Sequence, residues 1–240
     1  GYNILLMDGQ LDVAMISMLE QKFEKSRFTR VDSDVIDRLI AKEEHKEANL
    51  ESNQREILSS VFRSQLPQIK KVEFNVETQA LGENGAPIMI TQSEYMRRMK
   101  EMANIQAGMS FYGEMPNMYN LVLNADHKLV KQVLTDADNS CKAALEPIES
   151  EMANLNNRRK ELQKAQEGKK TEDIPQAEKD ELNDIEKKIS DETTKKQAVL
   201  GEYANGNKII HQLIDLALLQ NNMLKGEALT NFVKRSIELI

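Results

Sequence analysis

A long pattern of spaced apolar residues between Leu145 and Tyr203 predicts two long helices. Apolar side chains recur there every three or four residues in two arms, separated by the polar stretch EGKKTEDIP. That spacing is typical of a helix with one buried stripe, and Pro175 suits the first turn of the second helix. The pattern predicts an antiparallel helical hairpin with a coiled-coil seam, at about residues 141–205. The seam consists of Leu145, Ile148, Met152, Leu155, Leu162 and Gln166 in one arm, and Leu182, Ile185, Ile189, Val199 and Tyr203 in the other.

The stretch KVEFNVETQ carries the clearest strand signal in the chain. Its apolar residues Val72, Phe74 and Val76 alternate with polar ones, which is typical of a half-buried strand. Asn84-Gly85 favours a tight turn that leads back into the apolar run IMI, and NLVLN predicts a third strand. After that strand, Asn124 is expected to cap a helix. Together these patterns predict an α+β fold, with a small antiparallel sheet, packed helices and the protruding helical hairpin.

The first 45 residues read as the end of a preceding domain. YNILLM and SRFTRVDSD are predicted to be strands on either side of a helix from Leu11 to Phe23, and such a unit is too small to form a domain alone. We therefore expect this chain to belong to a longer protein. Residues 46–240 are expected to form a second domain that carries the hairpin as an insertion.

A methionine-rich segment follows the predicted sheet. Residues 93–120 hold six of the twelve methionines, and Thr91 with Glu94 has the spacing of a capping box. Apolar residues occupy about half of the circumference of the predicted helix, and the polar residues Arg98 and Gln106 interrupt this apolar arc. Such a helix can simply cover a core, as most amphipathic helices do. Methionine is also flexible and polarizable, so the same surface can adapt to varied partners.

The last residues of the chain are predicted to form a dimer interface. Ile209–Leu219 is apolar nearly all round, which is typical of a helix buried on several sides. A final helix carries Leu229, Phe232, Val233 and Ile237. We expect these two helices to make a constitutive homodimer, and Leu213→Glu or Val233→Glu to give monomers.

The bulk composition excludes several classes of protein. The chain has 240 residues with a net charge of −7, and no basic face is evident, which argues against binding to nucleic acid. No apolar run approaches the ~18 residues of a membrane span, and no signal peptide is visible. The single cysteine, Cys141, excludes an intrachain disulfide and fits a reducing compartment. A cytoplasmic location is therefore expected.

The sequence offers no recognisable catalytic or metal site. His45, His127 and His211 are far apart and lack the spacing of metal ligands, and no glycine-rich phosphate loop is present. Cys141 has no histidine near it in sequence. We therefore expect no enzyme activity, no catalytic residue and no cofactor in this chain.

The order of these parts resembles a known family. YNILLMDGQLDVAMISMLEQKF with SRFTRVDSD resembles the end of the middle domain of heat-shock protein 90 chaperones. KVEFNVETQALGENGAPIMI, TQSEYMRRMKEMANIQA, MYNLVLNADHKLVKQVL and the terminal helices resemble that family's C-terminal dimerisation domain, in its bacterial form. LNADH and LIDLALL are the most specific pieces. The resemblance covers nearly all of the chain except the hairpin, which is an insertion relative to the common bacterial pattern.

The resemblance implies an ATP-driven chaperone that works as a homodimer and binds partly unfolded client proteins. The ATP and Mg²⁺ site belongs to another domain of that family, so this chain is expected to bind neither. The chain ends in SIELI, so co-chaperones that read a MEEVD tail are not expected as partners. The implied client-contact residues are Tyr95, Met96, Met99, Met102, Ile105 and Met109. The terminal helices would form a dimeric four-helix bundle through Ile210, Leu213, Ile214, Ala217, Phe232, Val233 and Ile237.

A different class of function is the alternative. In it, the chain is a coiled-coil adaptor or scaffold dimer whose hairpin recruits one defined partner, and the methionine helix is ordinary core. The mass in solution, with and without the last 35 residues, would bear most directly on this choice.

Overall fold

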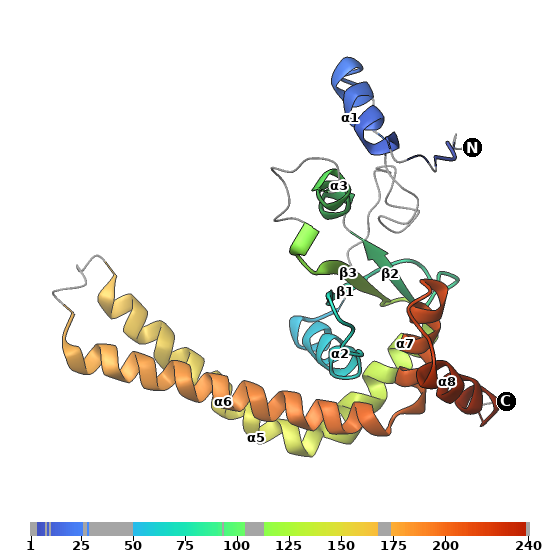
Figure 1. The fold of residues 1–240 in the computed structure, drawn as a ribbon. Helices are drawn as coiled ribbons and strands as arrows, with labels where there is room; N and C mark the ends of the chain where they lie inside the picture. The colour runs from blue at the N-terminus through green and yellow to red at the C-terminus, as the bar shows by residue number, and fades with distance from the viewer. Residues whose placement is uncertain are drawn as a thin grey trace.

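The computed structural model describes residues 4–7, 9, 11–25, 28, 50–92, 94–103, 113–167 and 174–238. These residues form seven helices and a three-stranded sheet, which confirms the α+β class. The elements in chain order are α1 (Asp12–Lys22), α2 (Ser52–Ser64), β1 (Val72–Gln79), β2 (Ile88–Gln92), α3 (Glu94–Ala103), β3 (Asn117–Asn124), α5 (Lys128–Gln166), α6 (Gln176–Gly206), α7 (Lys208–Gln220) and α8 (Glu227–Glu238). Figure 1 shows a body around the sheet, with α5 and α6 projecting sideways from its lower end and α1 at its upper end.

The sheet differs from the predicted antiparallel one. Its order is β1-β3-β2, with β1 parallel to β3 and β2 antiparallel to it, so β1 and β2 do not form a hairpin. Residues Leu121, Val122 and Leu123 are fully buried. A strand that is apolar on both faces stabilises the fold most at the centre of the sheet, and the alternating β1 suits an edge. The turn signal at Asn84-Gly85 therefore marks a loop that passes over the end of β3.

The side chain of Asn124 holds that loop instead of capping a helix. Its Oδ1 accepts hydrogen bonds from the backbone N–H groups of Leu81 and Asp126, both at 3.1 Å, and its Nδ2 donates to the carbonyl of Gly82 at 2.9 Å. Helix α5 begins at Lys128, and the ring of His127 accepts from the Leu129 N–H. The sequence prediction chose the wrong cap because either polar residue can precede a helix.

Only part of the prediction for the first 45 residues falls on residues that the structure describes. Helix α1 lies within the helix predicted from Leu11 to Phe23, but residues 4–7 are not part of a strand. The second predicted strand, SRFTRVDSD, falls almost entirely outside the described residues.

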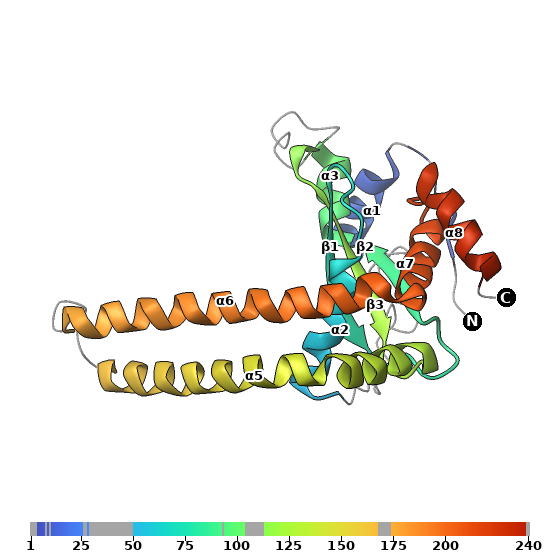
Figure 2. The ribbon, with the colours of Figure 1, turned by 90° about the horizontal axis from the view of Figure 1, so that it is seen from below.

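The main core lies between α2, the sheet, α7 and the body ends of α5 and α6. Helix α2 contributes Ile57, Leu58, Val61 and Phe62, all 2% exposed or less. Helices α5 and α6 run antiparallel, side by side, and both continue from this core into the projecting arm (Figure 2). Leu145, Leu200 and Ala204, which lie within the predicted hairpin, therefore belong to this core.

A buried lysine fixes the base of the arm. Lys196, 4% exposed, lies 3.1 Å from carboxylates of both Glu56 on α2 and Glu149 on α5, and donates to Asn53 at 2.9 Å. Beyond this point a second, smaller cluster of Leu155, Leu162, Ile185 and Ile189 fills the seam. The distal arm thus has its own core, whereas the proximal arm is part of the body.

Candidate interaction surfaces

Helix α3 carries four of the predicted client-contact residues. Tyr95 is 62% exposed, and Met96, Met99 and Met102 are partly exposed. Ile105 and Met109 lie outside the described residues. Thr91 is buried in β2, where it pairs with Asn120, so the predicted capping box at Thr91 is wrong. The described part of α3 has no fully buried residue, which distinguishes it from the core helices.

Polar contacts attach α3 to the body on one side. The Lys100 ammonium donates to the Met115 carbonyl and to Asn117 Oδ1, the latter at 2.7 Å. Burial lowers the pKa of Lys100, and the nearby charge of Lys71 lowers it further. These residues line a hollow of about 340 Å³, which Gln92 and Arg97 also border. The ammonium of Lys100 therefore acts as an anchor between α3 and the start of β3.

On another side, Arg98 attaches α3 to the N-terminal part of the chain. Its guanidinium forms an ion pair with Glu20 of α1 at 2.7 Å and donates to the Phe28 carbonyl at 2.5 Å. Arg98 lies within the predicted apolar arc, and this contact explains the presence of a charge there. Helix α3 is thus held by two cations, with its methionines only partly covered.

Helix α7 packs into the core of its own chain. Ile210, Leu213, Ile214 and Ala217 are at most 5% exposed and belong to the main cluster. Four of the seven residues predicted at the dimer interface therefore have little surface to offer a second chain. Leu216 and Leu219, on the other side of α7, are 39% and 37% exposed.

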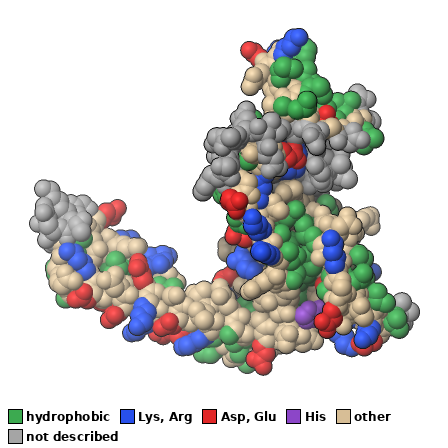
Figure 3. Space-filling view, in the orientation of Figure 1, with side chains coloured by type: hydrophobic (Ala, Val, Ile, Leu, Met, Phe, Trp, Pro, Cys, Tyr) green, Lys and Arg blue, Asp and Glu red, His purple; other side chains and the backbone are tan. Residues whose placement is uncertain are grey.

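Helix α8 has no buried residue. Phe232 is partly buried against the core, but Val233 and Ile237 are 48% and 69% exposed, and Leu229 is 36% exposed. Leu229, Val233 and Ile237 are four residues apart, so they form one stripe along the helix. We call these three residues with Leu216 and Leu219 the terminal stripe. Hydrophobic side chains are visible over this part of the molecule in Figure 3.

Polar side chains set how α8 lies against α7. Arg235 pairs with Asp215 and donates to Gln212 at 3.1 Å, and Gln212 donates to Ser236 at 2.6 Å. Arg235 and Asp215 are 18% and 20% exposed, so water screens this pair less than a surface pair. The terminal stripe is therefore presented by a helix whose orientation is fixed.

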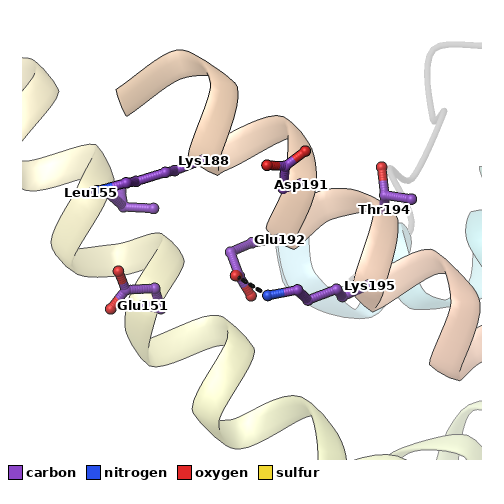
Figure 4. Close-up of a pocket in the computed structure, with 7 residues that line it drawn as sticks. All are labelled: Glu151, Leu155, Lys188, Asp191, Glu192, Thr194 and Lys195. Carbon is purple, nitrogen blue, oxygen red and sulfur yellow. Dashed lines mark hydrogen bonds and ion pairs between the residues drawn. The ribbon is translucent and has the colours of Figure 1, made fainter. Parts of the chain in front are cut away.

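The hollows and polar groups show no catalytic arrangement within the described part of the chain. The larger hollow, about 580 Å³, is an open groove between the arms of the hairpin, lined by charges of both signs (Figure 4). Cys141 is buried, and burial raises the pKa of its thiol, with the charge of Asp138 adding to the effect, so a reactive thiolate is disfavoured. His127 caps α5, His211 contacts the Asn205 carbonyl, and His45 is outside the described residues.

Two further features are absent from the described residues. No group of three or more histidine, cysteine or carboxylate side chains is placed to hold a metal ion. Among the same residues, no helix combines the length and apolar character of a membrane-spanning segment.

Sequence reasoning did not single out Leu216, Leu219 or Leu229 as interface residues, or Arg98 as an anchor. The spacing of Leu229, Val233 and Ile237 was a signal for a stripe on α8. The sequence signal for the outer side of α7 was its polar residues His211, Gln212 and Asp215, none of which is buried. Arg98 stood out only as a charge within an apolar arc.

Comparison with known proteins gives one consistent result. The chain is 70% identical over 240 residues to the chaperone protein HtpG of Bacteroides fragilis and 68% identical to that of Bacteroides thetaiotaomicron. It is 46% identical over 242 residues to HtpG of Porphyromonas gingivalis. Each match covers the whole of this chain and 35% of the relative. No protein-family model matches the chain. No solved structure matches it either.

The level of identity and its extent over every residue of the chain assign the family, as the resemblance of the sequence had indicated. The matched 35% is the C-terminal part of the relatives. The chain therefore belongs to the heat-shock protein 90 chaperones of the bacterial HtpG type, of which it is a C-terminal portion.

Proposed function

We propose that this chain is the dimerisation and client-contact region of an ATP-dependent chaperone that binds partly unfolded proteins. The observation that carries the proposal is the contrast between a well-packed core and two partly uncovered apolar helices, α3 and α8. The membership of the chain in the HtpG family supports the same assignment.

The proposed client surface is the exposed side of α3. Tyr95 is largely exposed and Met96, Met99 and Met102 are partly exposed, so apolar area is available without unfolding. Methionine adapts to many shapes at little strain, which suits a surface that must hold different sequences. Ile105 and Met109 are proposed to extend this surface.

The proposed dimer contact is the terminal stripe, formed with a second copy of the chain. The stripe lies on α8 and on the outer side of α7, which are both at the end of the chain and next to each other. Two copies that meet through α7 and α8 would bring four helices together. The buried residues Ile210, Leu213, Ile214 and Ala217 would then support the interface from inside each protomer.

Nucleotide chemistry is proposed to occur outside this chain. This chain spans 35% of the length of its HtpG relatives, and we propose that the remaining part of the whole protein binds ATP and Mg²⁺. We also propose that the whole protein works in the cytoplasm.

Replacing Met99 and Met102 together by Gln tests the client surface. Polar groups at partly exposed positions need not lose water, so the melting temperature should change by no more than about 2–4 °C, equivalent to ~1 kcal/mol. Capture of a model unfolded protein, measured per folded molecule by fluorescence anisotropy, should weaken severalfold.

The matched control is Met152→Gln, at a partly exposed methionine on α5, which should leave capture unchanged. If the Met99 and Met102 variant melts many degrees lower while capture per folded molecule stays the same, α3 is core and has no client role.

A further inference from the structure

The guanidinium of Arg98 joins α3 to two groups of the N-terminal part of the chain, Glu20 and Phe28, which lie 78 and 70 residues earlier. Its Nη1 donates to Glu20 Oε2 at 2.7 Å, and its Nη2 donates to the Phe28 carbonyl at 2.5 Å and to Glu20 Oε1 at 3.4 Å. The backbone N–H of Phe28 donates to Glu20 Oε1 at 2.6 Å. Both ends of the ion pair are thus also bound to the same backbone segment, which fixes their orientation.

This cluster has the features of a strong ion pair. The side chains of Arg98 and Glu20 are 16% and 22% exposed, so water screens them only partly. A guanidinium that contacts both oxygens of a carboxylate restricts direction as well as distance. A lysine could supply the charge but not this planar geometry.

Among the described residues, the cluster joins parts of the molecule that have few other contacts, of which the Lys100 anchor of α3 is one. Among the described elements, α1 packs chiefly against α3. Figure 1 shows α1 at the far end of the molecule, next to α3 and away from the core. Since none of the described side chains of α3 is fully buried, apolar packing among them does not by itself fix the direction of the helix.

We propose that Arg98 is a positioning residue for α3, and that its ion pair with Glu20 determines how the methionine side of α3 is presented to a client. The link to clients rests on the proposed function of α3. The ion pair keeps α3 in place before a client arrives, so the client does not have to order the helix on binding. Because Glu20 belongs to α1, a displacement of α1 is transmitted to α3 through this contact.

Hydrogen exchange of the α3 amides in the whole protein tests the positioning role directly. Arg98→Met and Glu20→Gln should each speed exchange in α3 by about tenfold, the range expected for a charge-assisted contact. The double variant should be no faster than either single one. Arg98→Lys should recover only part of the protection, and Arg98→Glu with Glu20→Arg should be slower than Arg98→Glu alone.

The control uses a similar pair elsewhere. Arg158 contacts both oxygens of Glu181 between the arms of the hairpin, at 2.7 and 3.2 Å. Arg158→Met removes the same type of interaction and should leave exchange in α3 unchanged.

Binding of a model unfolded protein separates this inference from the proposed function. In the Arg98→Met variant, the Kd for the model unfolded protein should rise, because α3 must now be ordered on binding. The increase should be at most the factor by which hydrogen exchange in α3 becomes faster. Unchanged exchange in α3 in both single variants, or additive effects in the double variant, would overturn the positioning role. Faster exchange with an unchanged Kd would leave that role intact and overturn the client role of α3.

Discussion

Helices α7 and α8 are neighbours of similar length, yet they use their apolar residues differently. Helix α7 buries five residues in the core of its own chain, and α8 buries none. The sequence of α7 is apolar nearly all round, so it can face the core and still leave Leu216 and Leu219 outside. The sequence of α8 is strictly two-sided, and its apolar side is largely uncovered.

Because α7 is buried and α8 is exposed, substitutions in the two helices should have different effects. A substitution on the inner side of α7 is expected to act on the fold of one protomer, whereas one on α8 is expected to act on the proposed dimer contact. Apolar content therefore indicates that a helix is buried, but it does not indicate whether its own chain or a second chain covers it.

The largest effect is expected for Leu213→Glu. Leu213 is 5% exposed, and a carboxylate there would be buried without a partner, at a cost of at least about 3–5 kcal/mol. That is a large part of the stability of a typical domain, so the cooperative thermal transition seen by circular dichroism should be lost or strongly lowered. From the sequence alone, Leu213→Glu was expected to give monomers. Because Leu213 is buried in its own chain, we now expect loss of the fold instead. A folded, monomeric Leu213→Glu protein would show that α7 is not core.

A change of assembly without unfolding is expected when Val233 and Ile237 are both replaced by Glu. These side chains are 48% and 69% exposed, so the folded protomer tolerates charge there, but a dimer interface of ~2,000 Å² or more would not. Sedimentation should show monomers with unchanged helix content. Asn231→Glu, on the opposite side of α8, should remain dimeric. An unchanged dimer in the double variant would place the interface elsewhere.

A smaller effect is expected for Arg235→Met, which removes the partner of Asp215 between α7 and α8. The pair is partly shielded, so its loss should cost ~1 kcal/mol, or about 2–4 °C in melting temperature. Lys208→Met breaks a pair with Glu238 whose side chains are 62% and 58% exposed, and should not shift the melting temperature measurably. Equal effects of the two variants would mean that the shielding of Arg235 contributes nothing.

The smallest effect is expected from replacing residues 155–189 by a short Gly/Ser linker. This removes the distal cluster and leaves Leu200 and Lys196 in place, so dimerisation should persist and the melting temperature of the body should shift by less than ~2 °C. Leu200→Ala, within the main core, should cost ~2–5 kcal/mol by comparison. Loss of binding to one defined partner after the deletion would favour the adaptor function over the chaperone assignment.

Local patterns in the sequence predicted the elements better than their partners. The alternation of Val72, Phe74 and Val76 predicted β1, and the three- and four-residue spacing predicted α5 and α6. The pairing of β1 with β3 could not be predicted, because it joins residues about 45 positions apart and depends on which strand is buried on both faces. Asn124 and His127 show the same limit, since each is a possible cap by residue type.

The sequence predicted which segments carry the candidate surfaces, but not which side of each helix is exposed. The sequence identified the terminal helices and the methionine helix, but it placed the whole apolar surface of α7 in one interface. The structure divides that surface, with Leu213 packed on the core and Leu216 exposed on the other side. The role of Arg98 depends on Glu20, 78 residues earlier, which no local pattern connects with it.

The joint at Lys196 makes the hairpin a lever. Lys196 attaches α6 to Glu56 and Glu149, and Pro147, two residues before Glu149, lacks the N–H that would complete a turn of α5. Bending is therefore easiest where the arm is also fastened to the body. Beyond this point α5 runs for roughly 25 Å, at ~1.5 Å per residue, so a tilt of about 10° at the joint moves the tip by roughly 4 Å. The hairpin thus converts a small bend at the joint into a displacement at the tip comparable with the width of a side chain.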